Sequence, residues 1–345
     1  MPEGGQLPRR SPPALGSWLP TGIKNWSVYR AWRSRYHGWQ HRQKLRREFE
    51  RLGRPPIALA FGEALGDALL TTCVLREWHR RELPPVTIVN PHAALFDGLP
   101  AAPIVLPPKP ESYQALAAYC PRVLIKHYAP HDFANDQDAP PTRHILAEIC
   151  HQAGLRGEIE LRPEIRLRAD ELARADFATG AICLHSTGLG AKYPMLNKEW
   201  SAGRFQELAA KLADQRLIQL GLPSDPLLPG ALDLRGKTSL RESAAILARA
   251  RLFIGQVGFM MHLARAVDCP AVVVYGGRER PDQTGYIGFT NLMRSPACSP
   301  CWRWNTCDHE RVCLSDISVD EVLSATRAAL HGPRPTLQTE SVLLA

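Results

Sequence analysis

The stretch from Ile57 to Leu75 constrains the fold of this chain more than any other part of the sequence. An apolar run, Ile57–Phe61, leads into a turn flanked by Gly62 and Gly66, and a helix-like segment then opens near Asp67. Strand, glycine turn and helix in this order form the opening unit of a nucleotide-binding α/β domain, with the site at the carboxyl end of the strand. The glycines do not form G-x-G-x-x-G, so a dinucleotide fingerprint is not supported. Asp67 is either a carboxylate facing that site or a first-turn acid favoured by the helix dipole.

Apolar runs alternate with helix-like segments twice along the chain, which predicts two α/β domains with doubly wound parallel sheets. The length of 345 residues agrees with two domains. We expect four parts, namely an extension at 1–56, a first domain at 57–165, a second at 178–330 and a loose tail at 331–345. The charged segment between the two domains is expected to bridge them.

The extension concentrates the positive charge of the chain. Residues 1–56 hold 12 Lys and Arg against 3 Asp and Glu, a balance of +9, and the remaining 30 basic and 31 acidic residues balance to −1. The near-neutral body argues against a broad nucleic-acid surface. Residues 1–23, rich in Pro and Gly, are expected to be disordered.

Residues 24–52 are predicted to form an amphipathic helix with aromatic residues on one face. The aromatic side chains recur at helical spacing and arginines crowd the same segment; the aromatic positions are Trp26, Tyr29, Trp32, Tyr36 and Trp39. A basic helix with Trp and Tyr suits the interface of an anionic membrane. Alternatively, the aromatic face packs on the protein body and leaves the arginines solvated.

The sequence gives no indication of export. No apolar run reaches the roughly 20 residues that span a bilayer, and the N-terminus lacks the apolar core of a secretory signal. We therefore expect a cytoplasmic protein. Five cysteines stand singly in apolar or helical-looking segments and are expected to be buried small hydrophobic residues: Cys73, Cys120, Cys150, Cys183 and Cys269.

The second domain opens with the same strand-to-glycine-turn pattern as the first. The run Ala181–His185 leads into a polar loop with Ser186, Thr187 and Gly188, whose hydroxyls and backbone N–H groups could hold a diphosphate. Lys198 follows this loop and is either a phosphate-binding lysine or a solvated surface residue.

Five sequence blocks then carry a resemblance to a known family. They are K-x-W-x-x-x-R-F at 198–205, L-G-D-A-L-L-T-T at 65–72, L-R-G-K-T-S-L at 234–240, Ile254-Gly255 with M-H-L-A at 261–264, and the cysteines at 298–313. Together, over roughly residues 57–330, they resemble glycosyltransferase family 9, the ADP-heptose heptosyltransferases of bacterial lipopolysaccharide assembly.

The resemblance implies a GT-B fold, in which two Rossmann-like domains face each other across a cleft. It implies an inverting single displacement with no cofactor required for catalysis, the sugar donor on the second domain and the acceptor entering from the first. Asp67 matches the proposed general base. The matching residues for the sugar donor are Ser186, Thr187, Gly188, Lys198, Gly255, Gly258, Met261 and His262. For His262, a satisfied structural histidine is the alternative.

One block departs from the family pattern. Where the family reads G-N-D-S-G, this chain reads Gly255-Gln256-Val257-Gly258-Phe259, so the acid thought to touch the donor is replaced by Val257.

Asp225 is a candidate ribose-binding acid by its place after a strand, or else a turn residue. Arg278 and Arg280 either meet an anionic ligand or lie in an exposed charged loop, and we expect the exposed loop.

Four clustered cysteines have the spacing C-x2-C-x5-C-x5-C. Cys298, Cys301, Cys307 and Cys313 could close a tetrahedral structural zinc or iron site. Reduced thiols or disulfides are the alternative.

These observations predict a glycosyltransferase that uses a nucleotide-sugar donor, ADP-heptose by the resemblance. The acceptor is expected to be a lipopolysaccharide core or another glycan or lipid-linked molecule. Residues 24–52 would contact the inner face of the bacterial inner membrane, and no nucleic-acid partner is expected. The rivals are a nucleotide-sugar 2-epimerase on the same fold, a catalytically weak or inactive relative suggested by Val257, and a nucleic-acid-binding protein.

Overall fold

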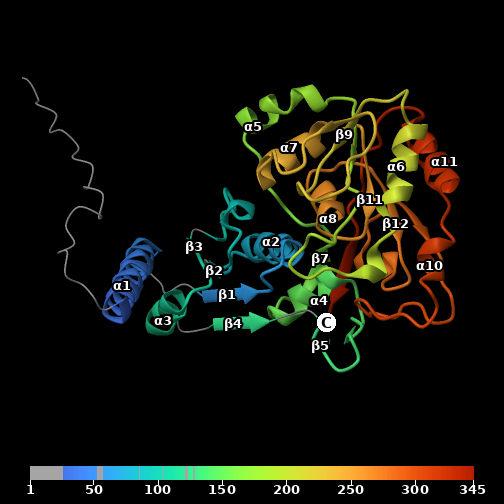
Figure 1. The fold of residues 1–345 in the computed structure, drawn as a ribbon. Coiled ribbons are helices and arrows are strands. Elements are labelled where there is room, and N and C mark those ends of the chain that lie inside the picture. Colours follow the sequence, from blue (N-terminus) through green and yellow to red (C-terminus); the bar gives the residue numbers. More distant parts are fainter. Residues whose placement is uncertain (1–25, 53–56, 85, 103, 121–122, 127–128) are drawn as a thin grey trace, which may run out of the picture.

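The computed structural model describes residues 26–52, 57–84, 86–102, 104–120, 123–126 and 129–345. Two parallel β-sheets lie at different ends of the molecule, each with helices packed around it (Figure 1). This arrangement confirms the mixed α/β fold with parallel sheets that the alternating sequence pattern predicts.

The first sheet has the strand order β3-β2-β1-β4, with every pairing parallel. Its strands are β1 (Ile57–Phe61), β2 (Val86–Val89), β3 (Ile104–Leu106) and β4 (Val123–Lys126). The elements around it are α2 (Leu65–Arg80), the 3₁₀ turn η2 (Ala93–Leu95), α3 (Pro110–Tyr119) and α4 (Ile145–Gln152). The order reverses beside β1, so the loop that begins at Gly62 lies where ligands bind in such sheets.

The second sheet has the order β10-β9-β8-β11-β12-β13, again entirely parallel. Its strands are β8 (Ile182–Leu184), β9 (Leu217–Gln219), β10 (Ala231–Asp233), β11 (Leu252–Gln256), β12 (Ala271–Tyr275) and β13 (Thr290–Met293). Its main helices are α6 (Ala202–Lys211), α7 (Leu240–Arg249), α8 (Phe259–Ala266) and α11 (Val319–Leu330). Numbered within the unit, this is the 3-2-1-4-5-6 order of a Rossmann fold, whose ligand position lies between β8 and β11.

Short sequence signals place these elements. The central strands β11 and β12 are buried along their whole length, as expected for parallel strands covered on both faces. Helix α7 begins at a capping box in which Ser239 and Glu242 satisfy each other's backbone N–H groups at 3.2 and 2.7 Å. The shorter elements are α5 (Ala169–Arg174), η3 (Asp176–Ala178), η4 (Leu196–Lys198), α9 (Pro281–Thr284) and α10 (Val312–Ser315).

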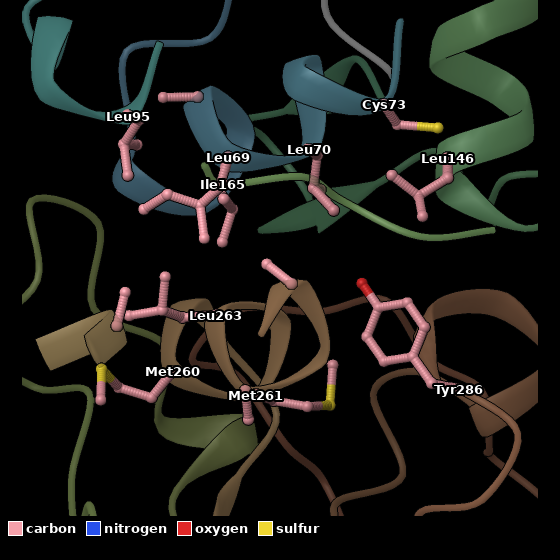
Figure 2. Close-up of a cluster of buried hydrophobic side chains, with 14 of the residues drawn as sticks. Leu69, Leu70, Cys73, Leu95, Leu146, Ile165, Met260, Met261, Leu263 and Tyr286 are labelled. Carbon is pink, nitrogen blue, oxygen red and sulfur yellow. The ribbon is translucent and has the colours of Figure 1, made fainter. Parts of the chain in front are cut away.

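The two units share a hydrophobic core. Helix α2 of the first unit packs on α8 of the second, and Leu69 and Leu70 face Met261 and Leu263 across the contact (Figure 2). All four side chains are buried. Because α2 and α8 each follow the central switch-point strand of their own sheet, this contact brings the two ligand-binding edges toward each other.

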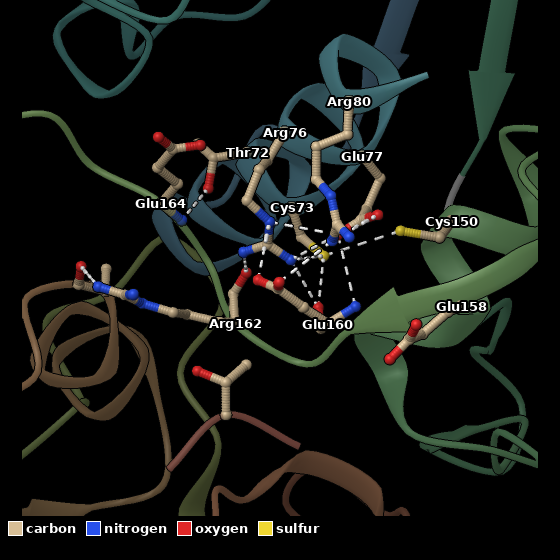
Figure 3. Close-up of polar contacts among 12 residues, drawn as sticks. Thr72, Cys73, Arg76, Glu77, Arg80, Cys150, Glu158, Glu160, Arg162 and Glu164 are labelled. Carbon is tan, nitrogen blue, oxygen red and sulfur yellow. Dashed lines mark hydrogen bonds and ion pairs between the residues drawn. The ribbon is translucent and has the colours of Figure 1, made fainter. Parts of the chain in front are cut away.

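Polar contacts fix α2 to the segment that links the units (Figure 3). Arg76 donates to the backbone oxygens of Glu160 at 2.7 Å and Arg162 at 2.5 Å, while its guanidinium pairs with the buried Glu77 at 2.9 Å. Arg162 in turn reaches Asp268 of the second unit at 2.6 Å. The linking segment is therefore a bonded part of the junction.

The C-terminal segment differs from the expected loose tail. Strand β14 (Ser341–Leu344) pairs antiparallel with β7 (Gly157–Glu160), and Arg334 donates to the backbone oxygens of Ala248 and Asp268, each at 2.8 Å. The prediction missed this pairing because the partner strand lies about half the chain away. A hairpin that was also not predicted joins β5 (His131–Asp132) and β6 (Gln137–Asp138).

Helix α1 (Trp26–Leu52) lies beside α3, at the edge of the first unit (Figure 1). The helix packs on the first unit through a different face from the one with the aromatic residues. Leu45 is fully buried in the core of the first unit, and His41 forms a hydrogen bond of 3.2 Å with Ser112 of α3. Trp32 and Trp39 are 50% and 51% exposed. The alternative in which the aromatic stripe packs on the protein body is therefore wrong.

None of the helices in the described ranges has both the length and the apolar character needed to cross a bilayer.

Candidate functional site

Asp67 lies in the first turn of α2, immediately beyond the carboxyl end of β1. Its carboxylate folds back over Gly62: a β-carbon on Gly62 would lie 2.1 Å from Asp67 Oδ2. Only glycine leaves room for this arrangement. The side chain is half-buried, and Thr71 Oγ donates to the Asp67 backbone oxygen at 2.8 Å. The sequence folds locally so that one carboxylate is held at the ligand edge of the first sheet.

The loop before α2 touches the ligand loop of the second sheet. Lys192 Nζ lies 2.8 Å from Glu63 Oε2, and both side chains are about half exposed. An exposed ion pair contributes little to stability, so this contact can open without a large cost. The pair nevertheless shows that the loop leading to Asp67 and the loop after β8 are neighbours.

The loop after β8 holds an internal carboxylate. Glu199 accepts hydrogen bonds from Thr187 Oγ1 at 2.8 Å, Gly188 N at 2.7 Å and Gln256 Nε2 at 2.6 Å. Burial raises the pKa of Glu199, against the effect of these three hydrogen bonds. Ser186 is fully buried, and its hydroxyl finds no partner among the described residues. Two groups of the loop that was predicted to hold phosphate are thus bonded to Glu199.

Lys198, at the end of η4, forms a buried ion pair. Its Nζ lies 2.5 Å from Glu279 Oε1, and Arg278 contacts the same oxygen at 3.0 Å. Burial lowers the pKa of Lys198, and Glu279 opposes that shift. Burial raises the pKa of Glu279, but the charges of Lys198 and Arg278 outweigh it and bring the value to about 2. The solvated-lysine alternative therefore does not describe Lys198.

Arg278 continues this network into the first unit. It pairs with Asp138 of β6, and its guanidinium lies 4.6 Å from the ring centre of Trp302. Asp138 also receives a hydrogen bond from His131 Nδ1 at 2.9 Å. Asp138 and Arg278 are both almost completely buried. The lysine predicted to bind phosphate is therefore linked through three successive ion pairs to a hairpin of the other unit.

His262 and Met261 lie in α8, close to Lys198. His262 Nδ1 is 2.6 Å from the hydroxyl oxygen of Tyr286, and Met261 Sδ accepts from Tyr275 at 3.5 Å. Burial, followed by the charge of Lys198, lowers the pKa of His262 to about 3. The imidazole is therefore neutral at physiological pH. Its bond to Tyr286 is what a satisfied structural histidine would make.

The other predicted sugar-donor residues lie along the same edge. Asp225 is buried and accepts from Leu222 N at 2.8 Å, so it holds the turn after β9. Gly255 lies inside β11, and Gly258 is the residue before α8. Val257, between them, is buried in the shared apolar core. This edge therefore presents no carboxylate at the position where the family pattern has one.

The structure sorts the predicted residues into groups. Lys198, Met261 and His262 belong to one buried cluster, while Thr187 and Gly188 bind Glu199, the residue next to Lys198. Asp225 faces the turn after β9. Asp67 stands on the opposite unit, and Glu63, in the loop that leads to it, pairs with Lys192 of the second unit.

Four contributors to the site were not predicted: Glu199, Gln256, Arg278 and Glu279. The expectation of an exposed loop is wrong for Arg278 and Glu279, which are 1% and 4% exposed, although Arg280 is exposed. Arg278 and Glu279 follow the buried strand β12, and this position could have predicted that they lie at the site, because loops after the strands of a parallel sheet border its ligand-binding edge.

The clustered cysteines border one cavity. Cys298, Cys301, Cys307 and Cys313 line a space of about 250 Å³ together with Arg278 and other residues. Burial raises the pKa values of the Cys301 and Cys313 thiols. Thiolates are suitable ligands for zinc or iron. Within the described ranges, however, no three His, Cys, Asp or Glu side chains are grouped closely enough to hold a metal. The four cysteines as placed here do not form the predicted metal site.

Comparison with known proteins gives one family and a set of similar folds. Residues 151–303 match the family model of glycosyltransferase family 9 (heptosyltransferase). A search of the curated proteins gives no match.

Several solved structures share the fold at low sequence identity. A family 9 glycosyl transferase from Veillonella parvula is 16% identical, with 80% of this chain and 97% of that chain covered and a TM-score of 0.57. The ADP-heptose lipopolysaccharide heptosyltransferase II of E. coli is 15% identical, with 80% and 98% covered and a TM-score of 0.59. The iron-containing dodecameric glycosyltransferase TibC of enterotoxigenic E. coli is 17% identical, with 81% and 79% covered and a TM-score of 0.61. These likenesses confirm the GT-B type fold.

The prediction that catalysis requires no cofactor needs correction. Two of the similar structures are described as iron-containing, TibC alone and TibC in complex with ADP-D-beta-D-heptose. Their description contradicts a cofactor-free expectation drawn from this family.

The family match confirms the resemblance drawn from the sequence blocks, and it covers residues 186–188, Lys198, α8, Cys298 and Cys301. The chain is therefore a glycosyltransferase of GT-B fold, with a glycosyltransferase family 9 (heptosyltransferase) region at residues 151–303.

Proposed function

We propose that this glycosyltransferase moves a heptose-like sugar from a nucleoside diphosphate donor, ADP-heptose in the first instance, to a lipopolysaccharide core or another cell-surface glycan. The main support is the placement of Asp67 at the ligand edge of one sheet, beside a loop that contacts the phosphate loop of the other sheet. One similar structure is the ADP-heptose lipopolysaccharide heptosyltransferase II of E. coli and another is TibC in complex with ADP-D-beta-D-heptose, which favours this donor.

The proposed reaction is a single displacement with inversion. Asp67 takes the proton from the acceptor hydroxyl while its oxygen bonds to the anomeric carbon. The bond between that carbon and the diphosphate oxygen breaks on the opposite face, and the electron pair leaves with the nucleoside diphosphate. Lys198 and the hydroxyl of Ser186 stabilise the charge that grows on the leaving group.

In this proposal the first unit, 57–165, receives the acceptor and the second, 178–330, holds the sugar donor. His262, Met261, Gly255 and Gly258 line the donor side, and Asp225 holds the adjoining turn. The neutral His262 can hydrogen-bond a ligand without repelling the Lys198 ammonium. Glu199 accepts a hydrogen bond from Gln256, the residue before Val257, which replaces the family's acid.

A donor screen tests this proposal. The purified protein is titrated with ADP-heptose and with GDP-, UDP- and CDP-linked sugars, and stabilisation is followed by thermal unfolding. Each donor is then incubated with and without core oligosaccharide released from bacterial lipopolysaccharide, and products are identified by mass and by sugar analysis. We expect ADP-heptose alone to stabilise the protein and to extend the oligosaccharide by one sugar. A donor sugar altered without any acceptor would instead identify an epimerase.

We further propose that the enzyme is cytoplasmic and contacts the inner face of the inner membrane through residues 24–52. Trp32 and Trp39 are about half exposed, and Tyr29, Trp32, Tyr36 and Trp39 stack along the helix at centroid distances of 5.5 to 6.4 Å. The positive charge of residues 1–56 complements an anionic bilayer.

Point variants test this contact better than deletion of the helix, because Leu45 of α1 is part of the core. We expect Trp32→Ala with Trp39→Ala to weaken binding to vesicles that contain anionic phosphatidylglycerol, and Phe177→Ala, another exposed aromatic residue, to leave it unchanged. Equal vesicle binding by wild type and double variant would rule out the aromatic face as the contact.

A further inference from the structure

Four aromatic side chains from three separate segments meet where the two units join. His131 lies 4.5 Å from Phe133 and 4.0 Å from Trp304, and Trp304 lies 5.9 Å from Tyr193, measured between ring centres. His131 and Phe133 come from the hairpin of the first unit, whereas Tyr193 and Trp304 belong to loops of the second. Phe133 is 87% exposed and Tyr193 is 46% exposed. The result is a row of rings across the junction, hereafter the aromatic row, in which Phe133 and Tyr193 are exposed while His131 and Trp304 are partly buried.

Backbone and side-chain hydrogen bonds hold this row in place. Trp304 N donates to Asp136 O at 3.0 Å, and its own carbonyl accepts from Asn197 N at 3.0 Å. His131 is fixed by its 2.9 Å contact with the buried Asp138. His131 and the Trp304 backbone, at the centre of the aromatic row, are therefore fixed before a ligand arrives, which lowers the ordering cost of binding there.

The surroundings of the row suit a carbohydrate. Lys192 Nζ stands 5.4 Å from the centre of the Tyr193 ring, and Asn135 and Asp132 form an exposed polar pair beside Phe133. A sugar ring has C–H faces that pack on the electron-rich face of an aromatic ring and hydroxyl groups at its edge that need polar partners. The aromatic row offers ring faces for the C–H groups of a sugar, and the neighbouring ammonium, amide and carboxylate groups offer polar partners for its hydroxyl groups.

The row also lies next to the proposed reaction centre. Asn197, which bonds the Trp304 backbone, precedes Lys198 in the chain. Lys192, beside Tyr193, pairs with Glu63 in the loop that leads to Asp67. We infer that Phe133, Tyr193 and Trp304 form a stacking platform for the glycan acceptor. This inference rests on the proposed function and adds to it the part of the surface that binds acceptor sugar rings.

Single and double variants test the platform, with core oligosaccharide released by deacylating bacterial lipopolysaccharide as the probe. Phe133→Ala and Tyr193→Ala remove exposed rings, so their thermal unfolding should match that of the wild type. Phe177→Ala is the matched control, because Phe177 is also about half exposed but lies in η3, outside the row. Binding of the oligosaccharide is measured by calorimetry, and KM is measured for the acceptor and for ADP-heptose.

We expect the double variant to weaken oligosaccharide binding and raise the acceptor KM by a factor on the order of ten, from the loss of two ring contacts. The ADP-heptose KM should stay at the wild-type value, and the control should behave as wild type. Unchanged oligosaccharide affinity in the double variant would overturn the platform. Wild-type protein that binds ADP-heptose but not the oligosaccharide would overturn the platform and leave sugar-donor recognition standing. Binding of neither molecule would overturn the proposed function as well.

Discussion

Lys198 Nζ lies 2.5 Å from Glu279 Oε1 in the interior of the molecule, so the lysine proposed to meet the leaving diphosphate already has a counter-charge. Glu279 also contacts Arg278, which pairs with Asp138 of the other unit. One carboxylate therefore stabilises two buried cations and helps to join the two halves of the enzyme.

Replacement of that carboxylate should be costly. Glu279→Gln leaves Lys198 and Arg278 without a shared anion, and breaking such a buried pair costs about 3–5 kcal/mol. The free energy of unfolding in guanidinium chloride measures the loss. Glu50→Gln is the control, since Glu50 pairs with Arg46 on the exposed surface of α1 and its replacement should change stability little. Equal losses in both variants would contradict the buried pair.

The same carboxylate predicts a pH dependence. Folding lowers the pKa of Glu279 from 4.5 to about 2, so its stabilising contribution is fully present above pH 4.5 and is lost as the pH falls toward 2. The difference in unfolding free energy between wild type and Glu279→Gln should therefore shrink over that acid range and stay constant above it. A difference that grew on acidification would have the wrong sign for this pair.

Two glycines near Asp67 form a matched pair of tests. A β-carbon at Gly62 would collide with the Asp67 carboxylate, whereas one at Gly66 would meet nothing within 4 Å. We expect Gly62→Ala to displace Asp67 and lower kcat by about 10²-fold or more, the range for loss of a positioned base. Gly66→Ala, inside α2, should keep activity and stabilise the fold by about 0.5–1 kcal/mol. The activity of both variants is measured under conditions where each is fully folded. A loss of activity in Gly62→Ala alone then reports the displacement of Asp67 and not a loss of fold stability.

Glu199 gives an electrostatic prediction for the phosphate loop. Its carboxylate accepts the hydrogen bonds of Thr187 Oγ1 and Gly188 N, and its negative charge would repel a diphosphate placed beside these two groups. Glu199→Gln keeps an acceptor oxygen but removes the charge, so ADP affinity should rise roughly tenfold, as expected for a like charge several ångströms away in a partly solvated site. Calorimetric titration with ADP measures it. A weaker affinity would show that the charge of Glu199 is needed for the shape of the loop.

The framework of the fold could be predicted because its signals are local. The strands β1, β8 and β12 are apolar runs followed by turns, and α7 and α11 begin at Ser-x-x-Glu capping boxes. The prediction of Asp67 at the start of a helix also rested on neighbouring residues alone. Each of these features depends on a short window of sequence.

The buried charge network could not be predicted in the same way. Arg278 looks like a surface residue until Asp138 is placed beside it, and the two are 140 positions apart. The antiparallel pairing of β14 with β7 has the same cause, because strand partners are set by tertiary packing. Glu199 was overlooked since its three hydrogen-bond partners come from two separate segments, the loop after β8 and the end of strand β11.

Sugar transfer by wild type and Asp67→Asn, compared side by side, tests the central claim most directly. Both proteins are incubated with ADP-heptose and the core oligosaccharide, product is followed by mass spectrometry, and ADP binding is measured on the same samples. The account predicts that the asparagine variant binds ADP like the wild type but forms product at least about 100-fold more slowly, because the amide cannot accept the hydroxyl proton. Transfer at the wild-type rate by Asp67→Asn would contradict it.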